Sequence, residues 1–292
     1  MTTSSDHRCR VLGSPWAGVY STYIRSSRHY GKHWHSTFGL GLLVQGAQSS
    51  ASGRGNVDAY AGDLIATNPG EVHDGRPLGG DSRHWRMVYI DPDVMELMNG
   101  EQELIVSGVE IMRPVFRDAK LRRSLQRLLG RIETWSGQSR SSPADVLACE
   151  ESLVQTTALL LARHGTQSPR CESAGDVNRA RDRLADSLLD PPSLGELAAT
   201  VGLSKYQLIR QFKRTYRLPP YTWLMVQRAE LARNLIQKGS GLAEAAASCG
   251  FADQSHMTRI FARHFGFTPG TWLKATGRAN PVLYRHQSKT RS

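Results

Sequence analysis

Two arginines, Arg210 and Arg259, lie 49 residues apart in segments of similar sequence, "LIRQFKRTY" and "MTRIFARHF". An arginine guanidinium presents a planar fork of donors, which can pair in bidentate fashion with the edge of guanine or with a phosphate. The neighbouring side chains are amides, hydroxyls and further cations, which hydrogen-bond to bases or neutralise phosphates. These residue types, repeated at one spacing, predict double-stranded DNA as the partner.

The similarity of the two segments extends beyond the arginines. When residues 204–224 are shifted by 49 positions, seven of the 21 residues are identical, among them Pro220 with Pro269 and Trp223 with Trp272. A self-match at a fixed spacing indicates a repeated structural unit. Since two copies are too few for a solenoid, the sequence predicts a module duplicated inside one domain.

Each copy has the signals of two short helices joined by a tight turn. In the first copy, Ser193 and Glu196 fit a capping box, Gly202 permits a left-handed turn, and Ser204 with Gln207 repeats the capping box. This order predicts a helix-turn-helix, whose second helix presents one polar face outward.

The second copy is expected to fold in the same way. Leu242–Ser248 is a short Ala-rich helix, Cys249–Phe251 makes the turn, and Asp253 caps the second helix. A helical pattern over Tyr221–Lys238 would bridge the copies with a strut of about 27 Å, which lets two helices enter successive major-groove segments of one duplex. The outward residues that we expect to contact DNA are Ser204, Tyr206, Gln207, Ile209, Arg210, Lys213, Arg214, Gln254, Ser255, His256, Thr258, Arg259 and Arg263.

The charge distribution agrees with a nucleic-acid partner for this part of the chain. The net charge is +11 in 292 residues, and residues 176–292 carry 18 Lys+Arg against 8 Asp+Glu. The remaining 175 residues hold 19 against 18 and are nearly neutral. A basic C-terminal part joined to a neutral N-terminal part favours a polyanion as the partner of the former.

The stretches "LAATVGLSKYQLIRQFKRTY" and "CGFADQSHMTRIFARHFGFTPGTW" resemble the AraC-type (AraC/XylS) bacterial transcription regulators. The resemblance covers about residues 180–274 and implies an all-α, seven-helix DNA-binding domain with two helix-turn-helix units bridged by a long helix. It also implies contact with RNA polymerase, mostly as an activator, with repression possible. One departure is that Gln211 stands at a usually apolar position and Ile209 at an often polar one.

Residues 19–90 resemble the cupin-like antiparallel β-barrel that serves as the sensor domain in many such regulators. The resemblance rests on His33-Trp34-His35, Gly62-Asp63-Leu64 and Pro69-Gly70-Glu71-Val72-His73, and it implies a small effector inside the barrel. Short apolar runs such as Phe38–Val44 and Trp85–Ile90 predict the strands. The candidate effector-binding residues are His33, His35, His73, Trp34 and Trp85.

The three histidines leave a second interpretation open. Residues i and i+2 of a strand share a face, so His33 and His35 could converge with His73 on zinc or iron. A metal-dependent cupin enzyme fused to a DNA-binding domain is therefore the alternative, and a ligand-independent dimeric regulator is a third. No carboxylate follows the His pair within Ser36–Gly41, so neither metal nor another cofactor is expected, and no catalytic residue is assigned.

Two amphipathic helices are predicted after the strands, over Arg117–Trp135 and Ala144–His164. The expected inner faces carry Leu121, Leu125, Leu128, Leu129, Ile132 and Trp135 in the first helix and Leu147, Val154, Leu160 and Leu161 in the second. Their apolar faces could pack on the barrel or on a second subunit, which favours a homodimer. The chain has no apolar run that could span a membrane and its first ten residues do not resemble a secretory signal, so we expect a cytoplasmic, nucleoid-associated protein. The expected organisation is a two-domain α+β chain with a sensor and dimerisation domain (1–165), a linker (166–176), a DNA-binding domain (177–280) and a disordered tail (281–292).

Overall fold

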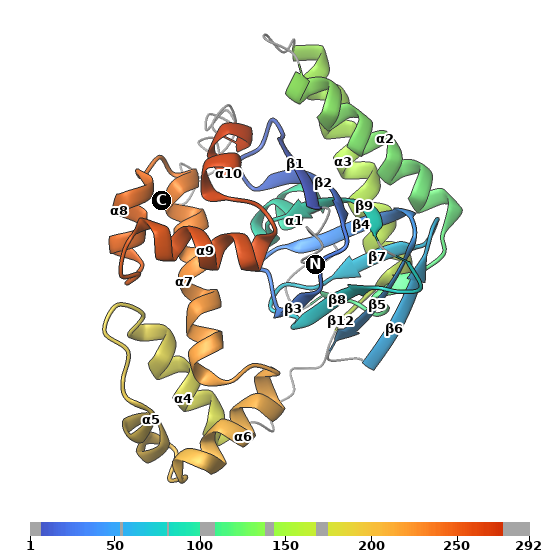
Figure 1. Ribbon diagram of the computed structural model, residues 1–292. Helices are drawn as coiled ribbons and strands as arrows, with labels where there is room; N and C mark the ends of the chain where they lie inside the picture. The colour runs from blue at the N-terminus through green and yellow to red at the C-terminus, as the bar shows by residue number, and fades with distance from the viewer. Residues whose placement is uncertain are drawn as a thin grey trace, which may run out of the picture.

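The computed structural model describes residues 7–52, 55–80, 82–99, 109–137, 143–167 and 175–276. A β-rich N-terminal domain is followed by a helical C-terminal domain, and Figure 1 shows them side by side. This order agrees with the predicted α+β class. The tail at 281–292 and most of the predicted linker lie outside the described residues.

The β-rich domain contains two antiparallel sheets that face each other across a cavity. The larger has the strand order β1-β2-β9-β4-β7-β11, and the smaller has the order β3-β8-β5-β6. The larger sheet consists of β1 (His7–Gly13), β2 (Val19–Ser26), β9 (Arg83–Ile90), β4 (Phe38–Gln45), β7 (Leu64–Thr67) and β11 (Val115–Phe116). The smaller consists of β3 (Tyr30–His33), β8 (His73–Pro77), β5 (Ala47–Ser52) and β6 (Gly55–Tyr60).

The predicted strands Phe38–Val44 and Trp85–Ile90 correspond to β4 and β9. The sequence did not predict the first strand, β1. Its first residues are mostly charged or histidine (His7, Arg8 and Arg10), so they show little of the apolar character that marked the other strands. It pairs with β2 along seven residues and so extends the sheet toward the C-terminal domain.

Helices cover the outer side of the larger sheet. The predicted helix Arg117–Trp135 is α2 (Ala119–Gly137), and its six predicted apolar residues are all buried. The predicted helix Ala144–His164 is α3 (Pro143–His164), but its expected inner face was partly wrong, since Leu147 is 65% exposed while Cys149 and Leu153 are buried. The domain also contains α1 (Pro92–Asn99) and the strand pair β10 (Val109–Ile111) and β12 (Gly165–Gln167), so the predicted linker begins inside a strand.

The C-terminal domain places two similar helix pairs at opposite ends of α7 (Pro220–Gln237) (Figure 1). Its other helices are α4 (Gly175–Asp186), α5 (Leu194–Thr200), α6 (Lys205–Tyr216), α8 (Leu242–Ser248), α9 (Gln254–Phe265) and α10 (Pro269–Thr276). Helices α4 to α6 lie away from the sheets, whereas α9 and α10 lie against them.

The helix starts and turns follow the local sequence. Ser193 and Ser204 each cap a helix in a complete capping box, with Glu196 and Gln207 as the reciprocal partners. Asp253 caps α9 by accepting a hydrogen bond from the backbone N–H of His256. Gly202 and Gly250 make the turns that follow α5 and α8, with φ values of +66° and +72° that favour glycine.

The two domains share one buried core. Trp272 of α10 is completely buried and makes an edge contact with Tyr20 of β2, with ring centroids 4.4 Å apart. At Gly13, the end of β1 approaches the carbonyl oxygen of Ala275 so closely that a Cβ atom would not fit. Helix α10, which follows the second helix pair, is therefore packed firmly on the β-rich domain. None of the helices in the described part of the chain is long and apolar enough to cross a membrane.

Candidate effector cavity and DNA-facing helices

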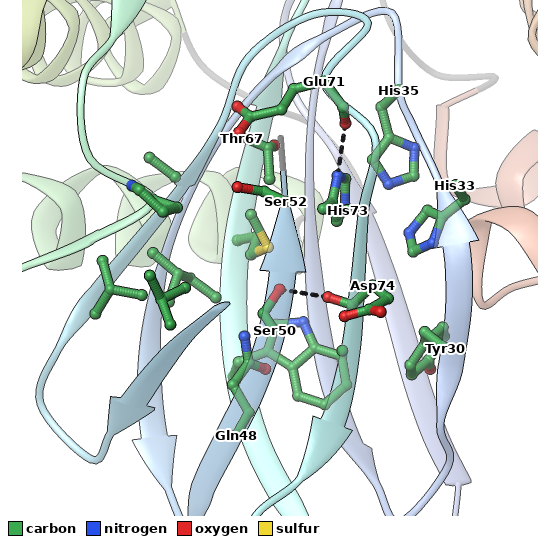
Figure 2. Close-up of a pocket in the computed structure, with 18 of the residues that line it drawn as sticks. Tyr30, His33, His35, Gln48, Ser50, Ser52, Thr67, Glu71, His73 and Asp74 are labelled. Carbon is green, nitrogen blue, oxygen red and sulfur yellow. Dashed lines mark hydrogen bonds between the residues drawn. The ribbon is translucent and has the colours of Figure 1, made fainter. Parts of the chain in front are cut away.

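A cavity lies between the two sheets of the β-rich domain, and it encloses about 810 Å³ including its open mouth (Figure 2). Alternate residues of β5, namely Gln48, Ser50 and Ser52, point into it from the smaller sheet. Trp85 and Met87 of β9 line it from the larger sheet. Ile24, Ile65 and Val115 add aliphatic surface, and such a mixture of apolar walls with a few polar groups is typical of a pocket for a small molecule.

The three predicted histidines meet at the mouth of this cavity. The ring centroids of His33 and His73 are 4.5 Å apart, and those of His33 and His35 are 5.0 Å apart. The Nδ1–H of His33 donates to Gly31 O, and that of His73 donates to Glu71 O. Burial lowers the pKa of all three imidazoles, so they are neutral at pH 7. In His33 and His73 the Nε2 atom is therefore a free acceptor.

The two predicted tryptophans lie in different places. Trp85 lines the cavity and carries the Arg83 guanidinium 4.8 Å above its ring. Trp34 does not line it, because His33 and His35 on either side face the cavity and the side chain between them points the other way. Trp34 is buried in the core shared with the C-terminal helices, so its expected place in the pocket wall was wrong.

Arg83 is a buried cation in the cavity wall, where three hydrogen bonds hold its guanidinium. It is 2% exposed, and its guanidinium donates to Gln48 Oε1, Arg28 O and Gly75 O, each at 3.0 Å. Burial lowers the pKa of Arg83 to about 10, which leaves it protonated at neutral pH. Its role is to hold β8 against β9 and to shape the cavity wall.

Helix α9 of the C-terminal domain forms one wall of the cavity. His264 and Phe265, on the inner face of this helix, are among the lining residues. The His264 ring centroid lies 5.1 Å from that of His35, and Phe265 stacks on His35 at 5.7 Å. The C-terminal domain therefore forms part of the cavity wall.

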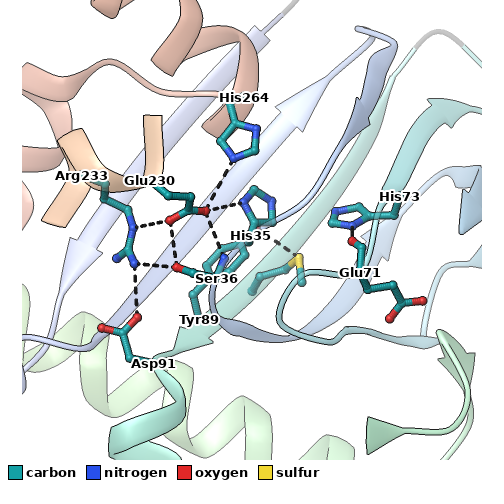
Figure 3. A network of polar contacts seen from close by, with 10 residues as sticks. His35, Ser36, Glu71, His73, Tyr89, Asp91, Glu230, Arg233 and His264 are labelled. Atoms are coloured by element: carbon teal, nitrogen blue, oxygen red, sulfur yellow. Dashed lines mark hydrogen bonds and ion pairs between the residues drawn. The ribbon is translucent and has the colours of Figure 1, made fainter. Parts of the chain in front are cut away.

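A buried polar network continues from this point into α7 (Figure 3). Glu230 accepts hydrogen bonds from the backbone N–H of Ser36 at 3.1 Å, from Ser36 Oγ at 2.8 Å and from Arg233 Nε at 3.1 Å. Arg233 Nη2 also reaches Asp91 Oδ1 at 3.3 Å. Burial alone would raise the pKa of Glu230, but His264, Arg233 and Ser36 lower it to about 2. This network joins α7 to the loop after β3 and to the start of α1.

Sequence reasoning missed Glu230, Arg233 and His264. Glu230 and Arg233 stand on the otherwise apolar face of α7, where both are buried. His264 occupies the position that Thr215 holds in the first copy of the repeat. Thr215 is exposed and His264 is buried, so the difference between the copies was the available signal that this position has a separate role.

The predicted DNA-facing residues lie on the outer faces of α6 and α9. Leu208 and Phe212 of α6 and Met257 and Phe261 of α9 are completely buried, which fixes which side of each helix faces solvent. The side chain of Tyr206 lies outside the described residues. Exposed side chains are Ser204, Gln207, Ile209, Arg210, Lys213, Arg214, Gln254, Ser255, Arg259 and Arg263, while His256 and Thr258 are partly exposed.

Two family models match the chain and together cover most of it. Residues 18–156 match the AraC-like ligand-binding domain, and residues 197–275 match a helix-turn-helix domain. The first range contains most of the residues that line the cavity, and the second contains α6 to α9 and the end of α5.

Similar proteins agree with these matches. The chain is 26% identical over 230 residues to the HTH-type transcriptional regulator YbfI of Bacillus subtilis, covering 77% of this chain and 80% of YbfI. It is 25% identical over 186 residues to the HTH-type transcriptional activator RhaS of Escherichia coli, covering 63% of this chain and 66% of RhaS. A crystal structure of a lysine-to-alanine variant of apo ToxT from Vibrio cholerae has a similar fold, with a TM-score of 0.50, 7% identity and coverage of 93% and 97%. The chain belongs to the AraC family of transcription regulators, with an N-terminal ligand-binding domain and a helix-turn-helix DNA-binding domain.

Proposed function

We propose that this regulator contacts promoter DNA through two helix-turn-helix units, α5–α6 and α8–α9, with α6 and α9 in successive major-groove segments. Arg210 and Arg259 are exposed at equivalent positions of the two copies and are the best placed for base contacts. Lys213, Arg214 and Arg263 follow on the same faces and would neutralise phosphates. The other predicted polar residues complete these two surfaces.

We further propose that a small effector binds in the cavity of the cupin-like barrel, against His33, His35, His73 and Trp85. The observation that carries this proposal is that the two faces of α9 serve different sites. Its inner face, at His264, closes the cavity, and its outer face presents Arg259 to DNA. An effector that binds the docked and undocked arrangements of α9 with different affinity would shift the balance between them.

The remaining parts of the proposal rest on family similarity and on the surface of the helices. The sign of regulation is activation through RNA polymerase, by analogy with RhaS. A homodimer would use exposed faces of α2 and α3, such as that of Leu147, because their apolar faces are covered within the chain. The sensor domain would end near residue 165 and the DNA-binding domain would begin near residue 177, in a cytoplasmic, nucleoid-associated protein without catalytic activity.

The DNA-contact proposal is tested at Arg259. The Arg259→Ala variant should lose about 1–3 kcal/mol of binding free energy on DNA selected from a random pool by the unaltered protein. The preference for one base pair should relax as well. Fluorescence anisotropy on the selected duplex and on its single-base variants measures both effects.

Two further variants distinguish base contact from phosphate contact. Arg259→Lys keeps the charge but lacks the bidentate fork, so it should behave like Arg259→Ala if the arginine pairs with a base. Arg76→Ala, at an exposed site on β8, serves as the control and should bind like the unaltered protein. Full affinity of Arg259→Lys, with all sequences weakened alike by Arg259→Ala, would assign Arg259 to phosphate.

The effector proposal is tested by thermal unfolding in a panel of small polar metabolites. A molecule present at 100 times its dissociation constant should stabilise the protein by about 2.7 kcal/mol. Ser50→Trp, which fills the cavity, should abolish this stabilisation. Ser49→Trp, on the opposite face of the same strand, should preserve it. Equal stabilisation of both variants would place the ligand elsewhere.

A further inference from the structure

Three buried side chains from both domains converge at the junction between the cavity and α7. His35 comes from the β-rich domain, Glu230 from α7 and His264 from α9, and they are 6%, 4% and 5% exposed. His35 Nδ1 lies 3.9 Å from Glu230 Oε1, and His264 Nε2 lies 3.6 Å from the same oxygen. One donor atom from each residue falls within 4.8 Å of the other two (Figure 3).

Three imidazole nitrogens in this group have no hydrogen-bond partner within the part of the chain that the structure describes. His35 Nδ1 and both ring nitrogens of His264 are buried and unsatisfied. A buried polar atom without a partner lowers the stability of the fold, so native proteins rarely leave several of them together. Two such rings aimed at one carboxylate oxygen point to a ligand that accepts electron pairs from all three.

The donor set suits a divalent transition-metal ion. Imidazole and carboxylate are ligands that zinc binds at about 2.0–2.2 Å, usually with four ligands in a tetrahedron. Bonds of that length separate neighbouring ligands by about 3.3 Å, close to the present 3.6 and 3.9 Å. Small side-chain rotations would complete the geometry.

The surroundings orient the ligands as metal sites require. Glu230 Oε2 accepts from Arg233 and from Ser36 Oγ, while Oε1 accepts from the Ser36 backbone N–H and also faces the two imidazoles. His33 borders the group, with its ring centroid 5.0 Å from that of His35 and 5.5 Å from that of His264. Its Nδ1 is anchored on Gly31 O, and such an outer hydrogen bond fixes the tautomer that presents Nε2 to a metal.

We propose that His35, Glu230 and His264 bind one divalent transition-metal ion of the Zn²⁺ type, with His33 beside the fourth coordination position. The ion joins the β-rich domain to α7 and α9. It thereby holds α9 in the docked arrangement, and a change in metal occupancy shifts the position of the outward Arg259 face. This regulatory consequence rests on the proposed function, whereas metal binding does not.

Metal binding is tested with the full, untagged chain after treatment with a chelator and dialysis. Calorimetric titration with Zn²⁺ should give one equivalent per chain, and Co²⁺ should give the visible absorption of a tetrahedral site. His264→Gln and His35→Gln should each weaken binding at least about tenfold, the lower range for altered metal sites. His29→Gln, an exposed histidine between β2 and β3, is the matched control and should leave binding unchanged.

Three results would overturn the proposal. The first is the absence of saturable Zn²⁺ uptake, which would leave the contact between Glu230 and His264 as a link between α7 and α9 only. The second is loss of binding in His73→Gln without loss in His264→Gln, which would place the ion on the histidines of the barrel alone. The third is an X-ray absorption spectrum of the zinc-loaded unaltered protein without histidine scattering, which decides the matter even if His264→Gln does not fold.

The two proposals fail separately. Specific DNA binding by the metal-free protein measures the proposed function without the ion. If that binding is normal while zinc is not taken up, only the metal site is rejected. If zinc is bound at His264 while no DNA preference can be selected, only the proposed function is rejected.

Discussion

Replacing Arg233 by methionine is expected to lower the free energy of unfolding by about 3–5 kcal/mol. Arg233 is 1% exposed and donates to Glu230, Ser36 and Asp91. Methionine fills a similar volume, but it leaves the Glu230 carboxylate buried without its cation. Removal of one partner from a buried ion pair is costly because the remaining charge has lost both its water and its counterion.

The double variant Glu230→Gln with Arg233→Met separates the charge effect from the loss of packing. Glutamine keeps an acceptor for the Ser36 backbone but carries no charge, so part of the stability should return. A coupling energy above about 1 kcal/mol in the double-mutant cycle is expected. Chemical denaturation of all four proteins measures it.

An exposed ion pair provides the comparison. Arg10 pairs with Glu133, with side chains that are 56% and 42% exposed, and Arg10→Met should cost less than about 1 kcal/mol. If Arg233→Met cost no more than Arg10→Met, the buried network would not hold the domains together.

The local features of the helical domain could be predicted because they depend on residues close in sequence. A serine followed three residues later by Glu or Gln satisfies its own helix start, so Ser193 and Ser204 identified α5 and α6. A positive φ at a turn favours glycine, so Gly202 and Gly250 identified the turns. None of these signals depends on the rest of the fold.

The orientation of α3 could not be predicted with the same accuracy. Its apolar residues lie around much of the helix, so periodicity alone favours no single face. The position of α2 decides the matter, because Ser124 of α2 and Thr156 of α3 share a buried hydrogen bond at 2.9 Å. This contact lies on the face of α3 that packs against α2, and Leu147 lies on the exposed face of α3.

The site was predictable only where its parts lie on one domain. His33 of β3 and His73 of β8 are paired across the smaller sheet, and His35 follows two residues after His33, so all three belong to one part of the β-rich domain. Glu230 and His264 are about 200 residues further along the chain. Their place in the site depends on how the two domains dock, and neither periodicity nor a helix cap contains that information.

The docking itself uses only one of the two copies of the repeat, and the tryptophans at equivalent positions can measure this. Trp272 is completely buried against Tyr20, Phe267 and the Arg233 guanidinium. Trp223, 49 residues earlier, is 6% exposed and packs within its own helical unit beside Phe212. Each change to alanine should cost about 3–5 kcal/mol, because each removes a large buried aromatic side chain.

The difference between the two tryptophans should appear in their coupling to the β-rich domain. Tyr20 stacks on Tyr89 at 4.7 Å and meets only Trp272 of the pair. A double-mutant cycle of Trp272→Ala with Tyr20→Ala should therefore give about 0.5–3 kcal/mol of coupling, whereas Trp223→Ala with Tyr20→Ala should give values near zero. Since α9 and α10 lie on the β-rich domain and α6 does not, only Trp272→Ala should also loosen the contact of His264 with the cavity. Equal coupling of both tryptophans to Tyr20 would mean that both copies dock, and the control of DNA binding through α9 alone would then have no structural basis.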